Sequence, residues 1–373
     1  MIKVLHVGEY AQGGVATYIQ TLLDHPEQTD IEDYVVCSKK NSAQEWGIPD
    51  THVFYYEYTR SVTQIPKAIL AIRSVIRKVR PDVIYCHSTW AGLFVRLPML
   101  VMGKPCRIIY NAHGWAFLRD TSEWKRKVYA LIERILLLRT DKVINVSKYE
   151  YRAAVRYGLS EKKQVVIYSG ISPVLQPIDP TVKLPLGKTN LLFVGRFDPQ
   201  KGLDLLLHAL STCKRDDLHL TVIGDNVVGG GVHIEKKNTD KVTFLGWIPH
   251  DKLGSYYNAC DAVIMPSRWE AFGLTAVEAM KYSRPVLVSN RGALPELVQD
   301  GKNGFIFQYA EDKALDRTWP HLSTLKTCLM GLNKQQLVAM RQNARQTYLD
   351  RFQSRQMLAA TADVLLLEKI RNE

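Results

Sequence analysis

Short runs of consecutive apolar residues alternate along the chain with longer stretches in which apolar residues recur every three or four positions. In the first half the short runs predict strands at Ile2–Val7, Tyr34–Cys37, Val53–Tyr58, Val83–Cys86, Arg107–Asn111, Lys142–Val146 and Val165–Ile167. The longer stretches predict helices at Val15–Leu23, Pro66–Arg80 and Ser122–Arg139. Continuous apolar strands that alternate with helices are typical of a parallel sheet covered on both faces.

The same alternation resumes after residue 188, with strands expected at Asn190–Val194, Leu218–Ile223, Val242–Leu245, Ala262–Met265 and Val286–Ser289. Helices are expected over Gly202–Leu210 and at the C-terminus, which includes MLAATADVLLLEKI. Residues 170–188 contain four prolines and no periodic pattern, which is typical of a linker. The pattern therefore predicts two doubly wound α/β domains, at 1–170 and 189–351, joined by a linker at 171–188.

Composition excludes several classes of protein. The 373 residues, 46% of them apolar, suit two packed domains and argue against disorder. The six Cys are too sparse for a disulfide scaffold, and none forms the CxxC pair of a zinc ribbon. No apolar run reaches the roughly 20 residues of a membrane span, and the longest attempt, Leu93–Met102, is interrupted by Arg96 and Pro98. The N-terminus resembles a strand rather than a signal peptide, so we expect a soluble protein of a reducing compartment.

The net charge of +12 predicts anionic partners and is unevenly distributed. Residues 60–163 hold 21 Lys and Arg against 7 Asp and Glu, a net charge of +14. The helices expected at Pro66–Arg80 and Ser122–Arg139 carry much of this surplus, either as solvated faces or as a docking face for anionic lipid. Nucleic acid is not an expected partner, because basic residues interleaved with stacking aromatics and reader motifs are absent from the sequence.

Two glycine-containing loops follow expected strands, where open α/β sheets bind their ligands. Gly13 and Gly14 precede a helix, and they fit either a plain turn or a close approach of backbone to an anion. In VGRFDPQKG, Arg196 offers a forked donor and Lys201 a point charge, a combination suited to a diphosphate. The alternative is that these are two surface cations that flank a loop.

A third loop, PSRWEAFGLTAVEAM, leads from a strand into a helix that begins near Gly273, so the amides of Phe272, Gly273 and Leu274 would lie where anions bind. Glu270 precedes this helix, where it could bind sugar hydroxyls or support the helix dipole. Glu278 lies among apolar neighbours and needs a partner, which could be a sugar hydroxyl or a local cation such as Lys281 or Arg284. Separately, NAHGW places His113 just after the strand Arg107–Asn111, in a structural or a catalytic role.

Together these loops resemble the retaining glycosyltransferases of family 4, which have the GT-B fold. The matching pieces span the chain in order: GGVAT at 13–17, AHG around His113, VGRFDPQKG, IGD at 223–225, FLGWIP at 244–249, PSRWEAFGLTAVEAM and GALPELVQDGKNGFIF at 292–307. The resemblance implies two Rossmann-like domains that face a central cleft. It also implies that the C-terminal helix, at 352–373, completes an N-terminal acceptor-binding domain, while 189–351 binds the nucleotide sugar.

The resemblance also implies roles for individual residues. Arg196 and Lys201 would neutralise the donor diphosphate, and His113 and Glu270 would act at the transferred sugar. Glu278 would hold the ribose. The remaining donor-binding positions implied are Gly13, Gly14, Gly246, Trp247, Ile248, Phe272, Gly273 and Leu274.

The expected chemistry needs no cofactor. The donor leaves as a nucleoside diphosphate, and cations and helix amides stabilise its growing charge best in the transition state. No two Asp residues are separated by one position, so the sequence has no DxD metal motif and we expect metal-independent transfer. Retention of configuration follows from the resemblance, and same-face transfer is favoured because no covalent nucleophile is apparent.

Substrates are less sharply indicated. We expect a UDP-hexose or UDP-N-acetylhexosamine donor, with GDP-mannose as the alternative. The basic first domain fits a lipid-linked glycan acceptor and an anionic membrane surface, in bacterial surface polysaccharide assembly (O-antigen, capsule or exopolysaccharide) on the cytoplasmic side of the membrane. A non-catalytic glycan- or nucleotide-binding relative is the other reading, but it would be expected to lose His113, Glu270 or the Arg196 and Lys201 pair.

Overall fold

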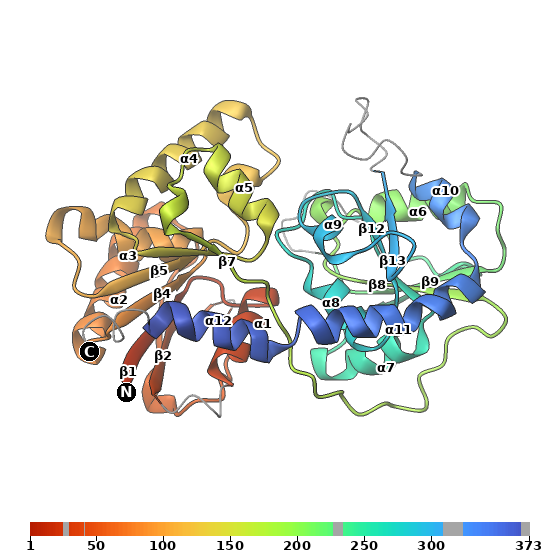
Figure 1. Cartoon of the computed structure of the whole chain (residues 1–373), viewed down its shortest axis with the longest axis horizontal. Coiled ribbons are helices and arrows are strands. Elements are labelled where there is room, and N and C mark those ends of the chain that lie inside the picture. The colour runs from red at the N-terminus through yellow and green to blue at the C-terminus, as the bar shows by residue number, and fades with distance from the viewer. Residues whose placement is uncertain (25–29, 41, 227–233, 309–323, 367–373) are drawn as a thin grey trace. The chain divides into compact units, whose positions relative to one another are not determined.

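The chain divides into two compact units in a computed structural model that describes residues 1–24, 30–40, 42–226, 234–308 and 324–366 (Figure 1). Unit 1 comprises Met1–Gly170 and Ser354–Glu373, and unit 2 comprises Ile171–Gln353. The expected linker, 171–188, holds no helix or strand and groups with unit 2.

Unit 1 is built on a seven-stranded sheet in the order β3-β2-β1-β4-β5-β6-β7, and all its neighbouring strands are parallel. The strands are β1 (Ile2–Gly8), β2 (Ile31–Ser38), β3 (Val53–Tyr56), β4 (Val83–His87), β5 (Arg107–Asn111), β6 (Lys142–Asn145) and β7 (Gln164–Val166). Its helices are α1 (Gly14–Leu23), α2 (Ile65–Val79), α3 (Thr89–Met102), α4 (Glu123–Leu136), α5 (Lys148–Arg156) and α12 (Ser354–Leu366).

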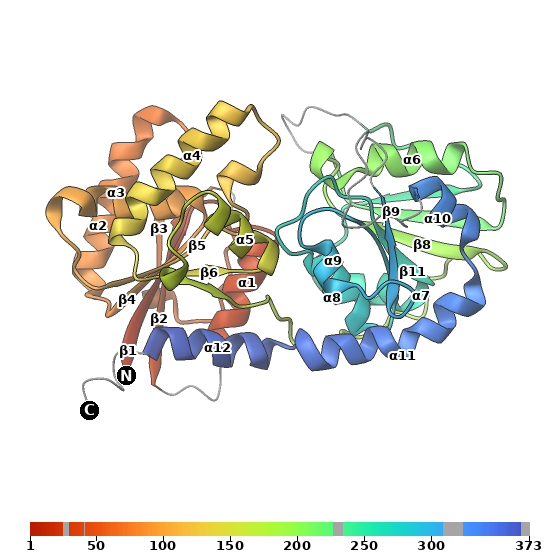
Figure 2. The same cartoon turned by 45° about the horizontal axis from the view of Figure 1, so that its top comes forward.

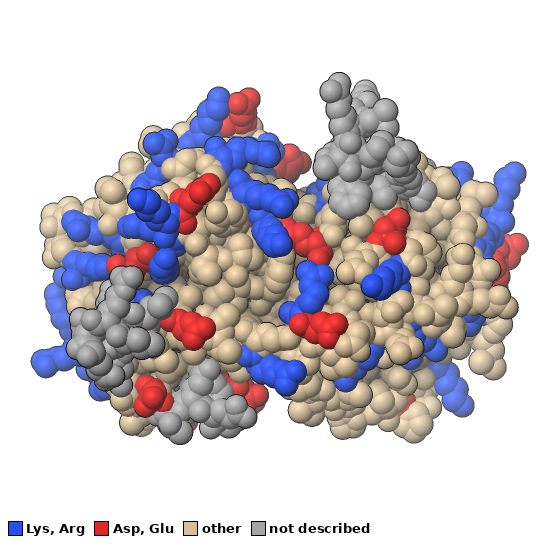
Figure 3. Space-filling model, viewed as in Figure 1, with Lys and Arg blue, Asp and Glu red and all other residues tan. Residues whose placement is uncertain are grey.

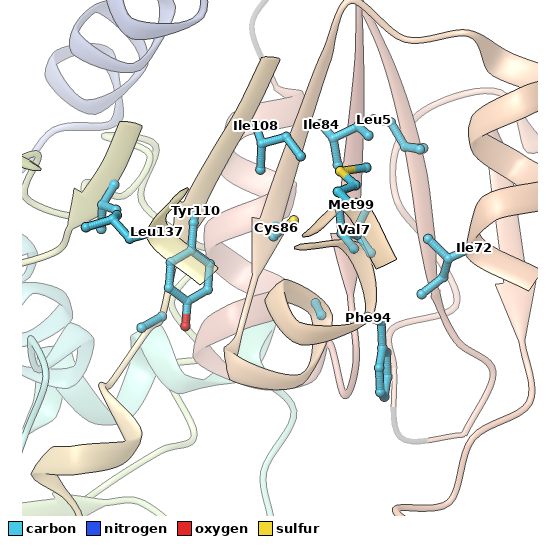
Figure 4. Close-up of a cluster of buried hydrophobic side chains, with 14 of the residues drawn as sticks. Leu5, Val7, Ile72, Ile84, Cys86, Phe94, Met99, Ile108, Tyr110 and Leu137 are labelled. Atoms are coloured by element: carbon cyan, nitrogen blue, oxygen red, sulfur yellow. The ribbon is translucent and has the colours of Figure 1, made fainter. Parts of the chain in front are cut away.

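The two faces of this sheet have different coverings. Alternate strand residues such as Leu5, Val7, Ile84 and Ile108 pack with α2 and α3 into the main core of the unit (Figure 4). Helices α1 and α12 contact each other and lie on the opposite side of the sheet from α2 and α3 (Figures 1 and 2). Each face of the sheet is thereby removed from water, as expected for a parallel sheet.

The stretch Leu93–Met102, considered above as an apolar run, belongs to α3 and is anchored by a buried ion pair. Arg96 is fully buried, and its Nη2 lies 2.9 Å from Oε2 of Glu133 on α4. The hydroxyl of Tyr110 donates to the other oxygen of Glu133, and the guanidinium stacks 3.7 Å from the centre of the Tyr110 ring. These contacts join α3, α4 and β5. Removing either Arg96 or Glu133 would leave the other as an uncompensated buried charge.

Unit 2 has a six-stranded parallel sheet in the order β10-β9-β8-β11-β12-β13. The strands are β8 (Thr189–Val194), β9 (Leu218–Ile223), β10 (Val242–Gly246), β11 (Ala262–Met265), β12 (Val286–Ser289) and β13 (Gly304–Phe307). Its helices are α6 (Leu203–Ser211), α7 (Leu253–Ala259), α8 (Leu274–Lys281), α9 (Leu294–Leu297), α10 (Leu325–Gly331) and α11 (Lys334–Arg351). The sheet order reverses between β8 and β11, and ligands bind at such a switch point in open α/β sheets.

The predicted strands and helices are found with end shifts of at most three residues, and four strands (β5, β9, β11 and β12) have the predicted bounds. Ser122 directly precedes α4 as expected, but its side chain makes no capping hydrogen bond. The expected terminal helix at 352–373 corresponds to α12, which begins at Ser354, and residues 367–373 lie outside the described residues. Within the described ranges, no helix is both long enough and apolar enough to cross a bilayer.

Candidate functional site

The loop after β8 packs tightly against the loop after β11. Gly202 is the N-cap of α6 with φ 68°, and a Cβ atom at this position would lie 2.0 Å from the carbonyl oxygen of Pro266. The backbone amide of Arg268 donates to the carbonyl of Gln200 over 2.7 Å, and the Arg268 guanidinium holds both oxygens of Asp204 at 2.8 Å. These contacts fix the two loops relative to each other at the carboxyl ends of adjacent strands.

Lys201 and Glu270 meet where these loops join. The Nζ of Lys201 lies 2.5 Å from Oε1 of Glu270, and the Ser267 hydroxyl donates to the same oxygen over 3.1 Å. Both side chains are largely shielded, with 20% of Lys201 and 8% of Glu270 exposed. The backbone carbonyl of Glu270 also accepts from the amide of Ala293, and Gly292 passes so close that a Cβ there would collide with it. Glu270 is therefore rigidly positioned.

Arg196 lies in the same loop as Lys201 but is far more open to solvent. Its guanidinium lies 3.0 Å from Asp198, and 56% of its side chain is exposed. A guanidinium held by a single carboxylate keeps most of its donors available for another anion. The structure thus gives the two predicted cations different settings, one shielded against Glu270 and one free to reorient.

Helix α8 begins directly after this junction. Gly273 occupies the N-cap position with φ 107°, and no side chain caps the helix there. Phe272 is buried against the ring of Phe352, whereas Leu274 is half-buried. The N-terminus of α8 thus follows β11 and Glu270, so the amides of Phe272, Gly273 and Leu274 lie at the start of this helix, as the sequence predicts.

Both carboxylate oxygens of Glu278 have protein partners. Oε1 lies 3.0 Å from Nε2 of His250, and the Tyr257 hydroxyl donates to Oε2 over 2.6 Å. These partners differ from Lys281 and Arg284, the local cations considered above. Burial alone would raise the pKa of Glu278. The hydrogen bond and charge of His250, the hydrogen bond from Tyr257 and the charge of Lys281 together outweigh burial and lower the pKa. The hydrogen bond to Glu278 in turn raises the pKa of His250.

The residues expected to flank the base lie at the end of β10. Gly246 closes the strand, Trp247 is 67% exposed and Ile248 is half-buried. His250 follows two residues after Ile248, so its bond to Glu278 connects this segment to α8. The exposed indole of Trp247 offers a surface on which a planar ring can stack.

In unit 1 the predicted glycines and His113 lie at the carboxyl edge of the sheet. Gly13 caps α1 with φ 59°, and both Gly13 and Gly14 are exposed. His113 follows β5 with φ 48°, a left-handed conformation that is costly for a residue with a Cβ. Burial lowers the pKa of His113 to about 3, so this imidazole is neutral near pH 7.

Sequence reasoning missed several partners of these residues. His250 and Tyr257 were not connected with Glu278. His87, whose Nδ1 lies 3.2 Å from Nε2 of His113, was not singled out at all. The available signal for His87 was a histidine directly after the continuous apolar run Val83–Cys86. His250 carried no such signal, because its partner is 28 residues away.

The arrangement in unit 2 is suited to an anionic ligand with hydroxyl groups. A guanidinium such as that of Arg196 and the amides of a helix N-terminus can donate to phosphate, and carboxylates such as Glu270 and Glu278 can accept from hydroxyls. Among the residues that the structure describes, no group of three or more His, Cys, Asp or Glu side chains is arranged to hold a metal ion.

Comparison with known proteins agrees with this geometry. A model of the glycosyl transferases group 1 matches residues 177–346, and a model of glycosyltransferase family 4 matches residues 12–174. An uncharacterized 41.2 kDa protein in the cps region of Klebsiella pneumoniae is 36% identical over 319 residues, which cover 83% of this chain and 87% of that protein. An uncharacterized glycosyltransferase of Methanocaldococcus jannaschii is 35% identical, over 79% of this chain and 80% of its own.

More distant similarities also cover most of the chain. An Escherichia coli UDP-Gal:α-D-GlcNAc-diphosphoundecaprenol α-1,3-galactosyltransferase is 22% identical over 76% of this chain and 77% of its own. The crystal structure of Anabaena HepE in complex with UDP and glucose superposes with a TM-score of 0.76 at 21% identity, covering 98% of this chain and 99% of that one, and confirms the expected GT-B fold. The two family models and the relatives above 30% identity lead to one assignment: the chain is a family 4 glycosyltransferase, one of the glycosyl transferases group 1.

Proposed function

We propose that this enzyme transfers a hexose or N-acetylhexosamine, with retention, from a UDP-sugar to a lipid-linked glycan during assembly of a bacterial surface polysaccharide. The observation that carries the proposal is the junction in unit 2, where Lys201 contacts Glu270 at the carboxyl ends of β8 and β11. The site combines cations for a diphosphate with a rigid carboxylate for sugar hydroxyls, and a nucleotide sugar contains both groups.

In the proposed reaction the bond between the anomeric carbon and the diphosphate breaks, and a bond from that carbon to an acceptor hydroxyl oxygen forms on the same face. The hydroxyl proton passes to the departing phosphate oxygen, and the nucleoside diphosphate leaves. Arg196, Lys201 and the α8 amides stabilise the charge that grows on that oxygen. Glu270 orients the sugar hydroxyls, Glu278 takes the ribose and His113 in unit 1 contacts the transferred sugar.

The partners of Glu278 refine this proposal. Because His250 and Tyr257 occupy both of its oxygens, a ribose hydroxyl would either replace His250 or share an oxygen with it. The exposed His250 is the more easily displaced of the two, since Tyr257 is buried. Gly246, Trp247 and Ile248 would then face the base, and Gly13 and Gly14 of unit 1 would approach the phosphates.

The choice of a UDP donor rests on similar proteins. HepE was crystallised with UDP and glucose, and the galactosyltransferase relative is named for UDP-galactose. GDP-mannose remains the alternative donor. The acceptor class rests on the same galactosyltransferase, which is named for a diphosphoundecaprenol-linked sugar, and on the cps region that encodes the Klebsiella relative.

The surface of α4 supports a membrane-linked acceptor on the cytoplasmic side of the bilayer. Large apolar side chains are exposed along this helix, with Trp124 at 64%, Leu131 at 53% and Ile135 at 44% exposure. The same helix carries Lys125, Arg126, Lys127 and Arg134, and Lys and Arg gather where α4 lies in Figure 3. Exposed apolar patches mark interaction sites, and an amphipathic basic helix favours an anionic lipid surface. We call the exposed side chains of Trp124, Val128, Leu131, Ile132 and Ile135 the α4 apolar face.

Thermal shift measurements with UDP-, GDP-, ADP- and dTDP-sugars test the donor. A ligand that binds only the folded chain stabilises it by mass action and so raises its melting temperature. At a ligand concentration a hundredfold above Kd, the added stability is about 2.7 kcal/mol. We expect the largest shift with a UDP-sugar, and with UDP alone. A melting-temperature shift with GDP-mannose but not with UDP-sugars would show that GDP-mannose is the donor. Binding of a nucleotide sugar without transfer to any lipid-linked acceptor would favour a non-catalytic protein.

A further inference from the structure

Four polar side chains form one hydrogen-bonded line across the sheet of unit 1. Asp33 Oδ1 lies 3.0 Å from Nε2 of His6, Nδ1 of His6 lies 3.0 Å from Nε2 of His87, and Nδ1 of His87 lies 3.2 Å from Nε2 of His113. The line therefore connects a carboxylate in the interior of the sheet to the imidazole expected to contact the sugar.

Strand register explains why the four side chains meet. Val4 of β1 pairs with Asp33 of β2, His6 pairs with Tyr85 of β4, and His87 pairs with Asn111 of β5. Each member of the line thus lies one strand over and two residues further along than the one before it. Since strand side chains alternate between faces with a period of two, Asp33, His6 and His87 project from the same face, and His113 follows two residues after the partner of His87.

The line is enclosed by protein. His6 and His87 are 1% and 0% exposed, and Asp33 is 8% exposed. The ring of Tyr18, on α1, packs edge-on against His113 with the ring centres 4.6 Å apart, and its hydroxyl bonds that of Tyr85. Residues of α12 line a small cavity beside His6 and Asp33. Burial and the neighbouring imidazoles lower the pKa of His87 well below its usual value.

The carboxylate gives the line a direction. An ionised Asp carboxylate only accepts hydrogen bonds, so Nε2 of His6 carries a proton in its contact with Asp33. In a neutral His6 ring, Nδ1 is then the acceptor. Nε2 of His87 then donates to His6 and Nδ1 of His87 accepts from Nε2 of His113, because a neutral imidazole has one donor and one acceptor nitrogen. Every ring in the line then carries its proton on Nε2.

We propose that Asp33, His6 and His87 are positioning residues that hold His113 in the Nε2–H tautomer, so that its Nδ1 accepts a hydrogen bond from a ligand hydroxyl. The identity of that ligand as a sugar rests on the proposed function, whereas the tautomer does not. The line also restrains the left-handed backbone at His113, which is costly unless the surroundings fix it.

Nitrogen chemical shifts of the full-length chain, labelled with 15N-histidine and measured by solid-state NMR, test the proposal directly. The His113 signals are assigned by their loss in H113N. We expect His113, His87 and His6 to carry protons on Nε2 and none on Nδ1. Asp33→Leu should produce a His113 population protonated on Nδ1, because the apolar side chain imposes no direction. Glu32→Leu, on the neighbouring residue of β2, should leave the tautomer unchanged.

Wild-type His113 protonated on Nδ1 overturns the proposal, as does a folded D33L protein whose His113 stays fully in the Nε2–H form. If D33L does not fold, the tautomer of His113 in the wild type still tests the proposal. Kinetics separate this proposal from the proposed function: D33L should lower kcat by roughly tenfold, the value of one hydrogen bond, with little change in the donor KM. The expected tautomers in a protein that transfers no sugar would leave the line standing and reject the proposed function.

Discussion

Lys201 of the loop after β8 lies 2.5 Å from Glu270 of the loop after β11, so the predicted phosphate-binding cation and the predicted sugar-binding carboxylate are direct partners. The contact gives Lys201 two tasks. It neutralises a shielded carboxylate, and in the proposed function it also contributes positive charge to the site of the donor diphosphate. Substitutions at either residue will therefore change both stability and activity, and the two effects must be separated.

A double-mutant cycle separates them. Lys201→Met alone leaves the Glu270 carboxylate without its cation and should cost about 3 kcal/mol of unfolding free energy, as for a broken buried pair. Glu270→Gln alone should cost about 1 kcal/mol, because the amide can still accept from Ser267. Chemical denaturation of the single and double variants measures the coupling energy, which we expect at about 1–3 kcal/mol.

Activity should behave differently in the same cycle. The double variant, with Lys201→Met and Glu270→Gln, should be more stable than Lys201→Met alone. It still lacks both proposed contacts to the donor, so its kcat/KM should remain at least about a hundredfold below wild type. Recovery of kcat/KM together with stability would mean that the pair serves only the fold.

Arg196→Ala tests the diphosphate role without this complication. The side chain is 56% exposed and its partner Asp198 also lies at the loop, so removal should change the melting temperature little. Loss of a charge-assisted contact in the transition state should lower kcat/KM by about 10²–10³-fold. Lys214→Ala is the matched control, because this exposed cation follows α6 at its other end. Equal activity of the two variants would contradict the proposed contact.

The bond between His250 and Glu278 makes stability depend on pH. A histidine whose pKa is raised by folding stabilises the protein fully below its unfolded pKa, about 6.5, and the contribution is lost as the pH rises through the folded value. Glu278, whose pKa is lowered, acts in the acid range instead, with its contribution lost only as the pH falls below about 4.5. Lys281 lowers and Asp251 raises the pKa of His250, but the Glu278 hydrogen bond is the largest influence.

His250→Gln should therefore remove the fall in unfolding free energy that the wild type shows as the pH rises above about 6. Between about pH 6 and pH 9, the wild type should lose up to about 0.5 kcal/mol relative to H250Q, a small amount because His250 is 60% exposed. Urea denaturation across this range measures the difference. A constant gap between the two proteins would show that His250 does not titrate against Glu278, and UDP binding by H250Q would reveal whether His250 competes with ribose.

Chelation tests the expected metal independence. Arg196, Lys201 and the α8 amides are proposed to supply the positive charge that a divalent cation supplies in other transferases. Enzyme treated with EDTA and passed through a desalting column should retain its full rate of sugar transfer. A rate that falls and is restored by Mn²⁺ would overturn this expectation.

The sequence was sufficient for the alternating architecture because both sheets are parallel and their strands are continuous apolar runs. It was insufficient where contacts cross the sheet. Nothing local marks Asp33 as the partner of His6, and the line to His113 depends on a register of two residues per strand that only the fold supplies. Helix α3 was missed for a related reason, since Arg96 interrupts its apolar pattern and is tolerated only because Glu133 faces it.

The α4 apolar face makes the membrane proposal testable by partitioning. Replacing Trp124 and Leu131 with Glu removes two exposed apolar side chains, each worth about 1.5–3 kcal/mol if fully buried, and adds charge that anionic lipid repels. Co-sedimentation with phosphatidylglycerol vesicles should fall by tenfold or more, while donor binding in unit 2 is unchanged. Leu186→Glu is the control, because Leu186 is 96% exposed and lies in unit 2.

Salt distinguishes the two contributions to this binding. Added NaCl screens the basic residues of α4 but not the burial of Trp124 and Leu131. Wild-type binding should therefore weaken with salt yet persist, and the double Glu variant should lose its residual binding entirely at high salt. Equal sedimentation of the wild type and the Trp124 and Leu131 variant at every salt concentration would leave the α4 apolar face without a role at membranes.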